Sequence, residues 1–151
     1  MRVMIATDGS DFSDFAVKKV CELIGKPDET SVRIITVYEH MLPMAAEPFA
    51  VSSEYYQEIE KEVRKQCVEF AEKSAKEVRE YFAGKEIDVS VEVERGAPDR
   101  VIIEAAKDWK ADLIAVGSHG RGFWGRMMLG SISDSVLHHA PCSVLVVRKP
   151  V

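Results

Sequence analysis

The stretch Asp112-Leu113-Ile114-Ala115-Val116-Gly117-Ser118-His119-Gly120, followed after nine residues by Gly130-Ser131-Ile132-Ser133, decides the fold. Its apolar beginning, residues 112–116, predicts a buried strand. Apolar residues then recur at helical spacing, which predicts a helix with one face made by Ile132, Val136, Leu137 and Ala140. Glycines and small hydroxyls therefore lie where a strand ends and a helix begins.

This junction has the chemistry of an anion site. Glycine lets the backbone approach a ligand closely. The first turn of a helix offers N–H groups without acceptors and a partial positive charge. Together these features predict a site for phosphate, with Gly130, Ser131 and Ser133 well placed in it. The alternative is a glycine-rich surface turn that precedes an ordinary Ser-capped helix.

The composition is that of a soluble globular protein: 151 residues, 46% hydrophobic and 30% charged, with a net charge of -5. This length fits one domain, residues 1–151. Because Lys and Arg are scattered, no nucleic-acid partner is expected. No apolar run reaches roughly 18 residues and no signal-peptide pattern begins the chain, so no membrane span is expected. The widely spaced Cys21, Cys67 and Cys142 favour buried thiols and a reducing compartment, the cytoplasm.

Strand and helix signals alternate along the chain. Strands are expected at residues 3–7, 32–37, 87–93, 112–116 and 143–147. This order predicts an α/β fold, a doubly wound, Rossmann-like sheet of five parallel strands with helices on both faces. The alternating run 87–93 suits an edge, which gives the strand order 3-2-1-4-5. The helix after Gly9 is expected to bury an apolar stripe of Phe12, Phe15, Ala16, Val20, Leu23 and Ile24.

Two polar turns converge in this topology. Ligands bind at the carboxyl ends of the strands where the strand order reverses, here between the first and fourth strands. Thr7-Asp8-Gly9 ends the first strand, and residues 117–120 follow the fourth. Asp8 would accept a hydrogen bond from a ribose hydroxyl or help to hold a metal ion; the alternative is a helix cap. The aperiodic segment 40–53 is a lid, a partner contact or a linker.

Motifs for catalysis are missing. Gly120-Arg121-Gly122-Phe123-Trp124-Gly125 matches the dinucleotide fingerprint, but it follows the fourth strand rather than the first. The sequence has no Walker motif, no Gly-x-Ser-x-Gly elbow and no zinc-ligand spacing. We therefore expect a nucleotide-binding regulatory protein with at most weak ATP hydrolysis. A slow ATPase or nucleotide-transferring enzyme, and a ligand-free dimeric scaffold, are the alternatives.

The spacing Gly117-x-x-Gly120, nine residues, Gly130-Ser131 resembles the ATP-binding signature of the universal stress protein family. The resemblance covers the chain from residues 3–10 through Gly96-Ala97-Pro98 to residues 129–147. It implies a dimeric stress-response protein that binds ATP, with Mg²⁺ or Mn²⁺ as a further component. In that arrangement Asp8 contacts the ribose, Val37 contacts the adenine, and the phosphates are held by Gly117, Gly120, Gly130, Ser131 and Ser133. The candidate binding residues are Thr7, Asp8, Val37, Gly117, Ser118, His119, Gly120, Arg121, Gly130, Ser131, Ile132 and Ser133.

The expected last strand, Ser143 to Val147, is apolar, β-branched and at a sheet edge. An uncovered edge of this kind invites pairing with another chain, because its N–H and C=O groups lack partners. Two copies satisfy each other around a twofold axis, so we expect a homodimer through this strand. The alternative is that the tail, residues 148–151, covers the edge.

Overall fold

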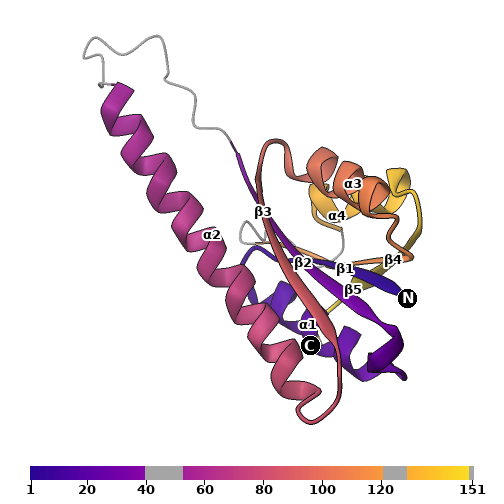
Figure 1. Ribbon diagram of the computed structural model, residues 1–151. Coiled ribbons are helices and arrows are strands. Elements are labelled where there is room, and N and C mark those ends of the chain that lie inside the picture. Colours follow the sequence, from indigo (N-terminus) through magenta and orange to yellow (C-terminus); the bar gives the residue numbers. More distant parts are fainter. Residues whose placement is uncertain (40–52, 121–128, 150–151) are drawn as a thin grey trace.

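The computed structural model describes residues 1–39, 53–120 and 129–149. Five strands form a parallel sheet in the order β3-β2-β1-β4-β5, which confirms the predicted topology. The strands are β1 (Arg2–Ala6), β2 (Ser31–Tyr38), β3 (Asp88–Arg95), β4 (Leu113–Gly117) and β5 (Ser143–Val147). The helices are α1 (Asp11–Leu23), α2 (Ser53–Tyr81), α3 (Pro98–Trp109) and α4 (Ser131–His139), and a short 3-10 turn spans Pro27–Glu29 (Figure 1).

Helices cover both faces of the sheet (Figure 1). On one face, α1 and α2 pack over a core that includes Ile5 and Ile34. On the other face, α3 and α4 pack over a core that includes Met4 and Ile35. Neighbouring residues of one strand are thus both fully buried, because they point into opposite cores. This double burial explains why the central strands are nearly continuous apolar runs.

Three apolar residues that were expected on inner helix faces are instead exposed. Leu23, in the last turn of α1, is 59% exposed, and Ile132 and Leu137 of α4 are 43% and 44% exposed. The prediction of a broad inner face was wrong for α4, because this nine-residue helix buries only Ser133 and Val136, three residues apart. A short helix that touches the body along one narrow line has no room to bury a wider stripe.

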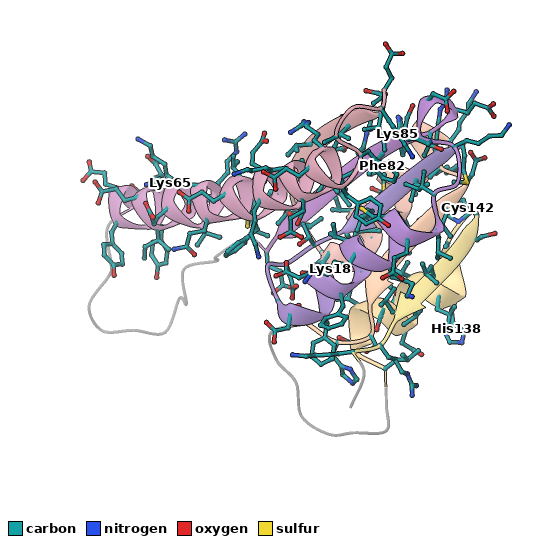
Figure 2. All side chains as sticks on the ribbon, turned by 90° about the horizontal axis from the view of Figure 1, so that it is seen from below. Lys18, Lys65, Phe82, Lys85, His138 and Cys142 are labelled. Atoms are coloured by element: carbon teal, nitrogen blue, oxygen red, sulfur yellow. The ribbon has the colours of Figure 1, made fainter. Side chains whose placement is uncertain are left out.

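The helix α2 is longer than the sheet that it covers. It has 29 residues, and its N-terminal half projects beyond the ends of the strands (Figure 1). Figure 2 shows Lys65 on the projecting half and Phe82 at the opposite end, beside the sheet. Apart from Ser53, which begins α2, the aperiodic segment 40–53 lies outside the described residues. None of the helices in the described ranges has a long enough apolar stretch to cross a membrane.

Candidate functional site

A cavity of about 290 Å³ lies at the carboxyl ends of β1, β2 and β4, where the strand order reverses. The two predicted turns therefore meet at one place. The candidate residues that line this cavity are Thr7, Asp8, Val37, Gly117, His119, Gly120, Gly130, Ser131, Ile132 and Ser133. Ser118 does not line it, and Arg121 lies outside the described residues.

The sheet opens at the cavity between β1 and β2. The last register pair is Ala6 with Ile35, and the last hydrogen bond runs from Thr7 N to Ile35 O over 2.9 Å. Backbone groups in a parallel strand point to alternate sides. The N–H and C=O of Val37 therefore point to the same side as those of Ile35. Among the described residues no β1 group continues the ladder there, so Val37 presents one donor and one acceptor to the cavity.

Asp8 has a defined orientation. Its Oδ1 accepts hydrogen bonds from Ser10 N at 3.0 Å and from Ser10 Oγ at 2.6 Å. Its Oδ2 is directed toward Gly120, where a Cβ would lie only 2.7 Å from that oxygen. Glycine at position 120 thus leaves room for the carboxylate at the cavity wall.

The first turn of α4 supplies the donors that an anion needs. Its N-cap, Gly130, has no side chain to cap the helix, and the first helical bond runs from Asp134 N to Gly130 O over 2.9 Å. The N–H groups of Ser131, Ile132 and Ser133 consequently have no acceptor within the helix. All three residues line the cavity. The partial positive charge of a helix N-terminus adds to these donors.

Ser118 has a structural role that the sequence did not suggest. It is 2% exposed, and its carbonyl accepts hydrogen bonds from Gly130 N at 2.8 Å and from Ser133 Oγ at 3.1 Å. Its own N–H donates to Val147 O over 2.8 Å. Its Oγ lies 3.1 Å from Nδ1 of His119. Ser118 therefore fixes the start of α4, which lines the cavity, against the end of β5.

Residues that sequence reasoning missed complete the cavity wall. These residues are Ala6, Ser13, Ile35, Pro98, Ile102 and Val116. Most are apolar and resemble ordinary core positions. Ser13 is 3% exposed, donates from its Oγ to Ser10 O at 2.8 Å and lies 3.1 Å from Thr7 Oγ1. Most of these residues could have been predicted from the strand order. In this topology the residues near the carboxyl ends of β1, β2 and β4 and the beginning of α3 face the same crevice.

The described residues contain no group of three or more His, Cys, Asp or Glu side chains that could hold a metal ion. Asp8 is the carboxylate that lines the cavity. Mg²⁺ is commonly held by one or two carboxylates together with substrate phosphates and water. The donor set therefore fits a divalent ion that arrives with a phosphate ligand, and does not fit an ion bound by protein side chains alone.

Comparison with known proteins identifies the family of this chain. The model of the universal stress protein family matches residues 1–148. The chain belongs to the universal stress protein family. A universal stress protein of Methanocaldococcus jannaschii is 34% identical over 149 residues, which cover 99% of this chain and 82% of that protein.

Solved structures share the fold. The hypothetical protein MJ0577 superposes with a TM-score of 0.82 at 23% identity, covering 99% of this chain and 96% of that one. A universal stress protein in complex with cAMP has a TM-score of 0.58 at 25% identity, covering 99% of this chain and 98% of that one. Some structural neighbours of this chain thus bind nucleotides.

Proposed function

We propose that residues 1–151 form one ATP-binding regulatory domain of a cytoplasmic stress-response protein. The observation that carries the proposal is the first turn of α4, whose open N–H groups at residues 131–133 line a cavity that also has an apolar wall. A phosphate group satisfies these donors, and an aromatic base fits the apolar side. The cavity of about 290 Å³ lies at the lower end of the range for ligand pockets, roughly 300–1,000 Å³.

Each part of ATP has a matching set of groups. The backbone N–H and C=O of Val37 pair with the donor and acceptor edge of adenine, between the side chains of Ile35 and Ile102. Asp8 accepts a hydrogen bond from a ribose hydroxyl. The turn from Gly130 to Ser133 holds the phosphates, and Mg²⁺ or Mn²⁺ that arrives bound to those phosphates would neutralise part of their charge. The solved relative in complex with cAMP supports an adenine nucleotide as the ligand.

Titration calorimetry tests this function. We expect ATP with Mg²⁺ to bind more tightly than AMP, because AMP carries one phosphate. Gly130→Val is the decisive variant. A Cβ at this position meets atoms no closer than 3.5 Å, so the fold survives, while the branched side chain occupies the phosphate space. Normal ATP binding by a folded Gly130→Val protein would show that this turn is not the site.

The alternative of a working ATPase or nucleotide-transferring enzyme is tested by turnover. Phosphoryl transfer needs a positioned nucleophile and stabilisation of the charge that develops. The groups that line the cavity supply binding. Nδ1 of His119 lies 3.1 Å from Ser118 Oγ, but Ser118 does not line the cavity, so this hydroxyl is not placed to act as a nucleophile there. We expect hydrolysis well below about 1 s⁻¹, the low end for kinases. Sustained turnover at that rate would favour the enzyme.

We also propose a homodimer through β5. The described part of the tail leaves the outer edge of β5 uncovered, since Lys149 bonds to Asp11 at 2.8 Å and lies 5.7 Å from the centre of the Phe15 ring on α1. Val147 O accepts from Ser118 N, so the odd-numbered residues of β5 bond to β4. The N–H and C=O of Val144 and Val146 therefore point outward, ready to pair with a second copy.

A further inference from the structure

We infer that Ser10, which does not line the cavity, is the positioning residue that aims Asp8 at the ligand. Ser10 thereby sets how strongly the site distinguishes ribose from 2′-deoxyribose. The inference rests on the proposed nucleotide site and deepens it, because it names a group outside that site on which its sugar specificity depends.

Both hydrogen bonds from Ser10 end on one oxygen of Asp8. The N–H of Ser10 lies 3.0 Å from Oδ1, and its hydroxyl lies 2.6 Å from the same atom. Two donors on one carboxylate oxygen fix the rotation of the carboxyl group. The other oxygen, Oδ2, is thereby directed to the side of Gly120, at the cavity wall.

The hydroxyl of Ser10 serves two groups at once. It donates its proton to Asp8 and accepts a hydrogen bond from Ser13 N at 3.3 Å, which makes Ser10 the N-cap of α1. A hydroxyl has one proton to donate and two lone pairs to accept, so the roles do not compete. The orientation of Asp8 is consequently tied to the start of a helix.

The turn between Asp8 and Ser10 has little freedom to move. Gly9 has a φ of +75°, which favours glycine, and a Cβ there would lie 2.7 Å from the ring of Phe70 on α2. Because α2 lies directly against the turn, Asp8 is free to change direction only through its side-chain torsions. Those torsions are what Ser10 restrains.

The consequence for a nucleotide follows from the chemistry of a carboxylate. An oriented carboxylate oxygen accepts a hydrogen bond from a ribose hydroxyl, and 2′-deoxyribose lacks one of these donors. Without the hydroxyl of Ser10 one of the two donors to Oδ1 is lost, the carboxylate is held less firmly, and the preference for ribose falls. The affinity for the base and the phosphates remains, because other elements hold them.

Three substitutions separate capping from positioning. Ser10→Asp keeps an N-cap acceptor but has no proton to donate at pH 7. Ser10→Gly removes the hydroxyl without adding charge, at a capping cost that is usually small. Ser10→Thr keeps both the proton and the acceptor. Asp8→Ala is the reference for complete loss of the carboxylate.

The experiment compares the Kd values of ATP and 2′-deoxy-ATP by calorimetry, with thermal unfolding as a check on the fold. We expect wild type and Ser10→Thr to prefer ATP by about tenfold or more, as expected for a hydrogen bond to a charged group. We expect Asp8→Ala to bind the two nucleotides about equally, and Ser10→Asp and Ser10→Gly, which keep only the backbone donor to Asp8, to have a preference for ATP several-fold smaller than that of wild type. A purely capping role would lower the unfolding temperature of Ser10→Gly without changing this ratio.

The measurements distinguish a failure of the proposed nucleotide site from a failure of the role of Ser10. If wild type binds neither nucleotide, the proposed function is overturned and this inference falls with it. If wild type prefers ATP and the folded Ser10→Asp and Ser10→Gly proteins keep that preference in full, this inference alone is overturned. An equal affinity of wild type for both nucleotides, or an unchanged ratio in Asp8→Ala, also overturns it while ATP binding itself stands.

Discussion

Gly117 and Phe12 are in direct contact: a Cβ on Gly117 would lie 2.8 Å from the carbonyl carbon of Phe12. The last residue of β4 thus lies against the first turn of α1 with no space for a side chain. The resemblance to known ATP-binding signatures assigned this glycine to phosphate binding. It does line the cavity, but the helix behind it requires a glycine as well.

Gly117→Ala should therefore destabilise the protein. The added methyl group overlaps backbone atoms of Phe12, which cannot move away as a flexible side chain would, and overpacking of this kind costs about 1–3 kcal/mol. Gly25→Ala is the matched control, because a Cβ at Gly25 meets no atom within 4 Å. Urea unfolding of both variants measures the difference. Equal stabilities would contradict a packing role for Gly117.

Val146→Pro should convert the proposed dimer into a folded monomer. The N–H of Val146 points away from β4, so proline removes a donor only at the outer edge. Leu145→Pro is the contrasting variant, because its N–H lies on the side of β4 and its loss should disrupt the sheet. Light scattering gives the mass and circular dichroism gives the fold. A Val146→Pro protein that stays dimeric would exclude β5 as the interface.

The thiol of Cys21 should be unreactive in the native protein. Burial raises the pKa of this thiol to about 11, with a further contribution from Glu77, so roughly one molecule in a thousand is thiolate at pH 8. Cys67 is also buried, whereas Cys142 is partly exposed. Alkylation with iodoacetamide, followed by peptide mass spectrometry, should therefore label Cys142 first. In denaturant all three should react at similar rates; early labelling of native Cys21 would contradict its burial.

The hydrogen bond between α3 and α4 should depend on pH. Ser135 Oγ donates to Asp99 Oδ2 at 2.7 Å, and this bond holds the pKa of Asp99 below its usual range. A lowered folded-state pKa contributes stability above the unfolded-state value of about 3.9, and this contribution is lost as the pH falls through the folded-state pKa.

Ser135→Ala should accordingly raise the pKa of Asp99, as measured by NMR titration of its carboxyl carbon. The free energy of unfolding of the variant should be lower by about 0.5 kcal/mol at pH 7. This value is near the low end for a hydrogen bond, because solvent screens this site. This difference in the free energy of unfolding between the variant and wild type should disappear in acid. A constant difference between pH 7 and pH 3 would mean that the bond to Asp99 is not its source.

Patterns of neighbouring residues were sufficient to predict the sheet. Continuous apolar runs identified the doubly buried strands, and the alternation of Val89, Val91 and Val93 with polar residues identified β3 as an edge. The converging turns followed from that topology. Residues where glycine and hydroxyl side chains are adjacent in sequence, as at residues 130–133, do line the cavity, and their role in binding stays a prediction.

The remaining site residues were beyond sequence reasoning for a physical reason. Ile35 and Ile102 look like core residues because most of their surface is core, and only the opening of the ladder after Ala6 exposes them to the cavity. A serine at a helix start is readily interpreted as a cap, but the direction of the Ser10 proton depends on the turn at Gly9. Ser118 has a hydroxyl of the kind that binds ligands. Its backbone, however, is bonded to Gly130 and Val147 and so supports the start of α4.

The three hydrogen bonds that meet at the backbone of Ser118 have a practical consequence for protein engineering. They join Gly130, Ser133 and Val147 to one point, so the chain that ends β4 is bonded both to the start of α4 and to the end of β5. Ile132 lies in the turn held by these bonds, is 43% exposed and lines the cavity. A fluorophore attached to a cysteine at position 132 would therefore sit at the cavity on a fixed backbone, as a reporter of whether the proposed ligand is bound.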